Sequence, residues 1–86
     1  MPYAYEFSED FRIKLSKISK KDKLLKERID KKIIEIVDNP EHYKPLRNVM
    51  KGNRRVHVGS FVMLYEIKGS IIRFLDIEHH DRAYIR

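Results

Sequence analysis

Cysteine is absent from the 86 residues of this chain. Its absence excludes disulfides, thiolate zinc sites and a cysteine nucleophile, and it fits a reducing cytoplasm. The first residues, MPYAYEFSED, carry neither the basic segment nor the apolar segment of a signal peptide. No run approaches the roughly 18 apolar residues that a membrane span needs. We therefore expect a cytoplasmic protein with no membrane partner.

Acidic residues are absent from one stretch, residues 44–58, although the chain carries 13 of them against 19 lysines and arginines. A concentrated basic segment is an electrostatic footprint for a polyanion, most often a nucleic acid, and it also suits an acidic protein partner. We predict RNA contacts here and at His79 near the chain end. The predicted RNA-binding residues are Lys44, Arg47, Lys51, Arg54 and His79.

The length favours one domain over residues 1–86. Alternating aromatic residues predict a strand over 3–7, and Ser8 is a good N-cap for the short helix that follows. Ser19 and Asp22 resemble a capping box, so we expect a second helix from Ser19 to Asp38, where Asn39-Pro40 ends it. Three more strands are predicted over 54–58, 61–67 and 71–78, with a lead-in strand over 45–49.

The expected fold is therefore α+β with the order β-α-α-β-β-β. The N-terminal helical hairpin would pack on one face of a small, mainly antiparallel twisted sheet. Side-chain alternation puts Val56 and Val58 on the covered face, together with the aromatic-rich side of the next strand. Arg55 and His57 would then lie on the open face, beside Val62 and Leu64 of the next strand.

Six side chains near the end of the chain and on one strand offer cations, imidazoles and a phenol. This set suits phosphodiester chemistry without a metal or other cofactor, because arginine stabilises charge on phosphate oxygens and imidazole is an acid or a base near neutral pH. Each also has a structural reading, as a solvated strand residue, a polar strand end or a tyrosine packed on the sheet. A zinc site is not expected, because the four histidines are scattered. The six are Arg55, His57, His79, His80, Arg82 and Tyr84.

Two segments, HYKPLRNVMKGNRRVHVGSFVMLYEI and IEHHDRAYI, resemble the RelE/ParE toxin superfamily, and the RelE branch most. The resemblance extends to the N-terminal strand and helical hairpin. It implies a toxin of a type II toxin–antitoxin system that cleaves mRNA on the ribosome without a metal and so inhibits translation. It also implies a cognate RelB-like antitoxin that wraps and neutralises the toxin, with operator DNA bound only through that complex.

Position by position, the resemblance implies catalytic roles for five residues. Arg55 and His57 match two basic family positions that contact the RNA backbone and assist proton transfer. His80, or else His79, matches the residue near the scissile phosphate. Tyr84 matches the C-terminal tyrosine that orients the nucleotide, and Arg82 is a further cation. The candidate catalytic residues are Arg55, His57, His80, Arg82 and Tyr84.

One position departs from the RelE pattern. The family has Gly-x-Tyr-Arg where this chain has Gly59-Ser60-Phe61-Val62, and valine cannot donate to a phosphate oxygen. Either Arg82 or Arg54 would supply the missing charge, or the nuclease is weak. The departure keeps two alternatives open: a ParE-type inhibitor of DNA gyrase, and a catalytically weak homologue that acts mainly by binding its partner protein.

Overall fold

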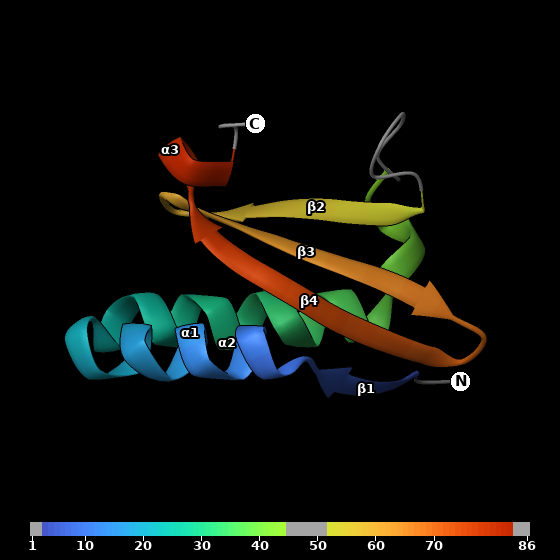
Figure 1. Ribbon diagram of the computed structural model, residues 1–86. Helices are drawn as coiled ribbons and strands as arrows, with labels where there is room; N and C mark the ends of the chain where they lie inside the picture. Colours follow the sequence, from blue (N-terminus) through green and yellow to red (C-terminus); the bar gives the residue numbers. More distant parts are fainter. Residues whose placement is uncertain (1–2, 45–51, 84–86) are drawn as a thin grey trace.

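Four strands form one mixed sheet, and two helices cover one of its faces in a computed structural model of the chain (Figure 1). The structure describes residues 3–44 and 52–83, and side chains as far as Asp81. The order is β1 (Ala4–Phe7), α1 (Glu9–Lys21), α2 (Lys23–Asp38), a 3-10 helix η1 (Pro40–His42), β2 (Asn53–Val58), β3 (Phe61–Lys68), β4 (Ile71–His79) and α3 (His80–Ala83). The predicted α+β class and helical hairpin are confirmed. The lead-in strand expected over 45–49 lies outside the described residues.

The sheet order is β1-β4-β3-β2. The last three strands form an antiparallel meander, and β1 joins β4 in parallel. Two-residue connections turn the meander at Gly59-Ser60 and Gly69-Ser70, where the glycines take φ of 57° and 60°. Glycine has no Cβ and adopts this left-handed region without the steric cost that other residues meet.

The expected start of the second helix at Ser19 is wrong. Ser19 lies inside α1, which continues to Lys21. Asp22 separates the helices: its backbone N–H donates to the Ile18 carbonyl at 2.8 Å, and its side chain accepts from the Leu25 N–H at 3.0 Å. One aspartate thus ends α1 and caps α2, which a capping-box pattern three residues earlier did not reveal.

The core lies between the helical hairpin and the sheet. Phe11, Ile29 and Ile36 from the helices meet Tyr65 and Phe74 from the strands, all at 0% exposure. The buried Tyr65 hydroxyl donates to the Pro40 carbonyl at 2.6 Å, which ties β3 to η1. Within residues 3–44 and 52–83, no helix is long and apolar enough to cross a membrane.

A β-bulge in β4 decides which side chains reach the open face. The register shifts between Leu64 and Tyr65 of β3, so that Leu64 pairs with Asp76 while Tyr65 pairs with Phe74, and Leu75 is the extra residue. Strict alternation from Phe74 would turn Asp76 toward the helices. The bulge instead turns Ile77 into the core, at 1% exposure, and Asp76 to the other face.

Candidate active site on the open face of the sheet

Two rows of side chains cross the open face at the end of the sheet nearest α3. The register places His57, Val62 and Glu78 in one row. The next row holds Arg55 and Leu64, followed by Asp76. Arg55 and His57 therefore share the open face with two carboxylates, Asp76 and Glu78, which were not among the residues predicted from the sequence.

α3 brings a second imidazole to His57. It lies on the opposite side of the sheet from α1 and α2 (Figure 1). The His80 N–H at its start donates to the Ser60 carbonyl at 2.6 Å, which anchors α3 to the β2–β3 turn. The His57 and His80 rings then lie 6.0 Å apart between centroids, and both side chains are exposed. Two candidate acid/base residues from separate elements thus meet at the surface.

Val62 does not present an apolar spot to solvent. It faces the α3 side of the sheet, yet only 2% of it is exposed. α3 contacts β3 and β4, so we attribute this burial to α3 and the flanking His57 side chain. An arginine at this position would emerge on the α3 side of the sheet, where the shorter valine is buried.

The adjacent histidines pack against different rings, His79 against Phe61 and His80 against His57. The His79 ring packs edge-on against Phe61, with centroids 5.4 Å apart and an interplanar angle of 76°. Asp81 lies near both imidazoles, with carboxylate oxygens 3.8 Å from His79 Nδ1 and 3.5 Å from His80 Nδ1. Asp81 was not among the residues predicted from the sequence, although its position directly after the histidine pair was a usable signal.

Lys14 of α1 offsets part of the negative charge of Asp76 and Glu78. Its Nζ lies 2.8 Å from an Asp76 oxygen and 2.6 Å from a Glu78 oxygen. Partial burial lowers the pKa of Lys14, but the hydrogen bonds to Asp76 and Glu78 outweigh it and raise the pKa above its ordinary value. A phosphodiester approaching this face therefore meets two carboxylates already paired with a cation.

The remaining predicted residues are dispersed. Arg54 shares the helix-side parity of Val56, and its guanidinium donates to the Tyr43 carbonyl. Lys44 is exposed just beyond η1. The backbone of Arg82 lies in α3. Three predicted residues lie outside the described part of the chain: Arg47, Lys51 and Tyr84.

Solved toxin structures share this fold. The toxin–antitoxin complex RelBE2 of Mycobacterium tuberculosis matches with a TM-score of 0.77 and 23% identity, covering 92% of this chain and 99% of that one. The YoeB/ParE toxin of Agrobacterium tumefaciens matches with a TM-score of 0.80 and 15% identity, covering 90% and 98%. The architecture is thus the fold that these solved toxins share.

Sequence comparison narrows this class to a family. The family model for the ParE toxin of type II toxin–antitoxin systems, parDE, matches residues 5–84. A candidate toxin named RelE4 from Methanocaldococcus jannaschii is 41% identical over 73 residues, which is 81% of this chain and 78% of that protein. The chain belongs to the ParE toxin family of type II toxin–antitoxin systems, within the RelE/ParE superfamily. The predicted resemblance is confirmed.

Proposed function

We propose that this toxin is an endoribonuclease that cleaves mRNA on the ribosome, in the cytoplasm, and is neutralised by a cognate antitoxin. The observation that carries the proposal is the meeting of His57 and His80 on the open face, with ring centroids 6.0 Å apart, where His57 pairs with Val62 across the sheet. Cleavage at a ribose needs one group to take the 2′-hydroxyl proton and another to protonate the leaving 5′-oxygen. Two imidazoles at this separation suit opposite sides of one phosphodiester.

The roles follow from chemistry and position. His57 and His80 are the acid/base pair, and either imidazole serves near neutral pH. Arg55 lies on the same face of β2, two residues before His57. It holds a phosphate oxygen and stabilises the charge that develops there. Arg82 of α3 and Tyr84 complete the site in this proposal, as a second cation and as the group that orients the nucleotide. The RNA supplies the nucleophile, so the protein needs no cofactor for this step.

Cleavage of message in a reconstituted translation system tests the proposal. Wild-type toxin should produce new 5′ ends in ribosome-bound mRNA, mapped by primer extension. His57→Gln and His80→Gln should each slow cleavage by about a hundredfold or more, since positioned acid/base groups contribute on that scale. His42→Gln, at an exposed histidine on η1, is the matched control and should cleave at the wild-type rate. Intact message at full translational arrest would reject the nuclease.

A second function, inhibition of DNA gyrase, is supported by the match to the ParE toxin model and by Val62 at the position where the RelE pattern has arginine. Purified toxin should then block gyrase supercoiling, and His57→Gln with His80→Gln should leave that inhibition unchanged. If gyrase supercoils DNA equally fast with and without the toxin, this alternative is rejected. A toxin inactive in both assays that still binds its antitoxin would be a homologue acting by protein binding.

A further inference from the structure

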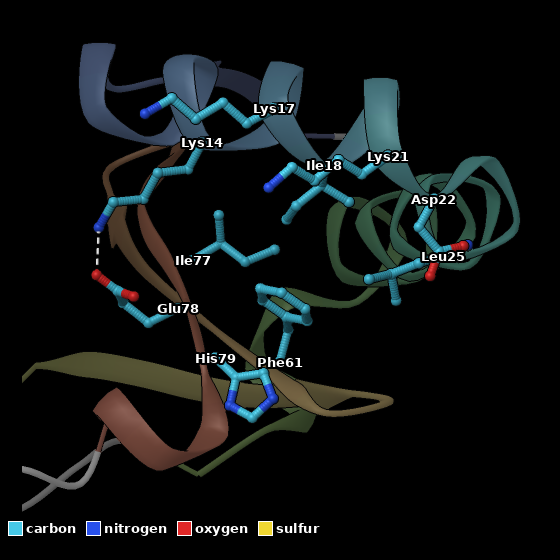
Figure 2. Close-up of a pocket in the computed structure, with 10 residues that line it drawn as sticks. All are labelled: Lys14, Lys17, Ile18, Lys21, Asp22, Leu25, Phe61, Ile77, Glu78 and His79. Atoms are coloured by element: carbon cyan, nitrogen blue, oxygen red, sulfur yellow. Dashed lines mark hydrogen bonds and ion pairs between the residues drawn. The ribbon is translucent and has the colours of Figure 1, made fainter.

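The outward face of α2 carries the two most exposed large apolar side chains of the described residues. Leu24 and Ile34 each expose 69% of their surface. The neighbouring Leu25 turns instead into a groove between the helices and the sheet, opposite Phe61 and His79, as Figure 2 shows. A single apolar residue on a surface needs no explanation, but two on one face of one helix are a pattern that an interface produces.

Ile29 marks the direction opposite to this face. It is fully buried, at 0% exposure, and belongs to the core beneath α2. Leu24 lies five residues before Ile29, and Ile34 lies five residues after it. With 3.6 residues per turn, both side chains lie about 40° from the line directly opposite Ile29, one on each side. A twofold axis along that line would therefore exchange the positions of Leu24 and Ile34.

The central charges of the face follow the same symmetry. Glu27 lies two residues before Ile29 and Lys31 two residues after it, and both are exposed. Each is then about 20° from the outward line. In the described part of the chain, neither takes part in an ion pair, although a spacing of four residues on a helix allows one. An acid and a base thus lie unpaired between two exposed apolar side chains.

Lys23 and Glu35 add an outer pair to the pattern. They lie six residues before and six residues after Ile29, and both are exposed. A Glu35 oxygen is already 3.0 Å from Lys32 Nζ of the same chain, so the outer pair contributes less than the central one. Each of the three exchanged pairs matches an apolar residue with an apolar one or an acid with a base.

We propose that the outward face of α2 binds the same face of a second copy of this chain, with the two helices antiparallel and a twofold axis at Ile29. Leu24 of each copy then packs on Ile34 of the other, which removes apolar surface from water. Glu27 of each copy pairs with Lys31 of the other, so four charges of alternating sign surround the axis. A twofold contact requires such a self-complementary surface.

Other arrangements of this face are less favourable. An antiparallel pair with its axis at Lys31 would set Lys31 against its own copy and Glu27 against Glu35. A parallel pair would place every residue beside its own copy, with the same repulsion. A nucleic acid is not favoured either, because the charges of Lys23, Glu27, Lys31 and Glu35 sum to zero and a polyanion needs an excess of cations.

The contact is small and leaves the candidate active site exposed. One helix of 16 residues, about 24 Å long, offers less surface than the roughly 1,200 Å² at the lower end of stable interfaces, so the dimer is weak and reversible. The helices lie on the opposite side of the sheet from α3, and a second copy on α2 therefore does not cover His57 or His80 (Figure 1). The proposal is independent of mRNA cleavage.

Charge reversal tests the contact in the whole chain, by sedimentation equilibrium over a concentration series up to about 1 mM. Glu27→Lys and Lys31→Glu each set like charges against one another in a dimer of a single variant. An equimolar mixture of the two restores both opposite-charge pairs in a dimer that holds one copy of each. Lys68→Glu, at the exposed end of β3, makes the same change as Lys31→Glu and is the control. Circular dichroism verifies that each variant is folded.

We expect wild type and Lys68→Glu to dimerise with equal affinity. Glu27→Lys and Lys31→Glu should each dimerise about tenfold or more weakly, because two attractive pairs become repulsive ones. The mixture should return to the wild-type affinity, which a variant weakened by misfolding could not do. A wild type that stays monomeric through the series, equal affinities for all four proteins, or a mixture that associates no better than its components would overturn the proposal.

Cysteine crosslinking tests the register, because the chain has no cysteine of its own. Leu24 of one copy faces Ile34 of the other, whereas the two copies of Leu24 are separated by ten residues, about 15 Å along the helices. A disulfide needs Cα atoms within about 7 Å of each other. A mixture of Leu24→Cys and Ile34→Cys should therefore crosslink on mild oxidation far more than either variant alone. No crosslink in the mixture, or equal crosslinking of one variant alone, would overturn the antiparallel arrangement.

Discussion

Tyr65 offers the sharpest test of how the core supports the site. It is fully buried, and its hydroxyl donates to the Pro40 carbonyl at 2.6 Å. Tyr65→Phe removes this donor and leaves a buried carbonyl without it, which costs about 1–3 kcal/mol of unfolding free energy near neutral pH. The exposed Tyr5 provides the control, because Tyr5→Phe at 53% exposure should change stability by less than about 0.5 kcal/mol.

The pH dependence of this difference has a defined sign. Burial raises the pKa of Tyr65 from 10.0 to about 12, against a smaller lowering by Arg54. A folded pKa above the unfolded one gives stability that is complete below pH 10 and is lost as the pH rises toward 12. At about 1.4 kcal/mol per unit, and with the group half ionised at each end of this window, the wild type loses about 2 kcal/mol through Tyr65.

Tyr65→Phe has no such group to ionise, so the stability gap between it and the wild type should narrow by about 2 kcal/mol between pH 10 and 12. Urea unfolding followed by circular dichroism at several pH values measures the gap. The difference in phenolate absorbance between the two proteins separates the titration of Tyr65 from that of the other four tyrosines. A gap that stays constant through pH 12 would refute the assignment of the raised pKa to Tyr65.

Three further substitutions test other parts of the fold by chemical denaturation. Lys14→Met should lower the free energy of unfolding by about 1 kcal/mol, and by less in high salt, because its ion pair with Asp76 is one-third exposed. Lys17→Met on the same helix should cost little, and equal losses for the two variants would contradict a stabilising role of the Lys14 ion pairs. Ile33→Ala should lower the free energy of unfolding by about 2–5 kcal/mol, and Leu25→Ala by less, because Leu25 is only half-buried. A larger loss for Leu25→Ala than for Ile33→Ala would contradict the packing. Ser8→Ala should cost about 1–2 kcal/mol through its N-cap, and an unchanged midpoint would show the cap to be dispensable.

Much of the fold was predictable because its signals are local. Alternation and turn residues located β2, β3 and β4 to within one residue at each end. Ser8 was recognised as a cap, and its side chain does accept from the Phe11 N–H at 3.0 Å. The start of α2 was misplaced because Ser19 and Asp22 satisfy a capping pattern that the continuing packing of α1 overrides. The helix α3 was not predicted, since four residues carry no periodic signal.

The site was predictable only in part. Parity alone placed Arg55 and His57 on the open face, because a strand alternates its side chains whatever it pairs with. Glu78 and Asp76 were missed as members of that face, because the bulge at Leu75 appears only when β4 is paired with β3. Arg54 was predicted to contact RNA, although side-chain alternation turns it to the face opposite Arg55, where its guanidinium donates to the Tyr43 carbonyl.

The amino-acid sequence by itself determined the class of the chain: its strand and helix periods, its glycine turns, the absence of cysteine and the basic segment over 44–58. These are properties of neighbouring residues, and they hold in any conformation. Only the tertiary structure decided that His57 meets His80, that His79 turns to the opposite groove, and that Lys14 pairs with both Asp76 and Glu78. Each of these depends on the register of the sheet and on how the helices pack against it, which together set distances between residues far apart along the chain.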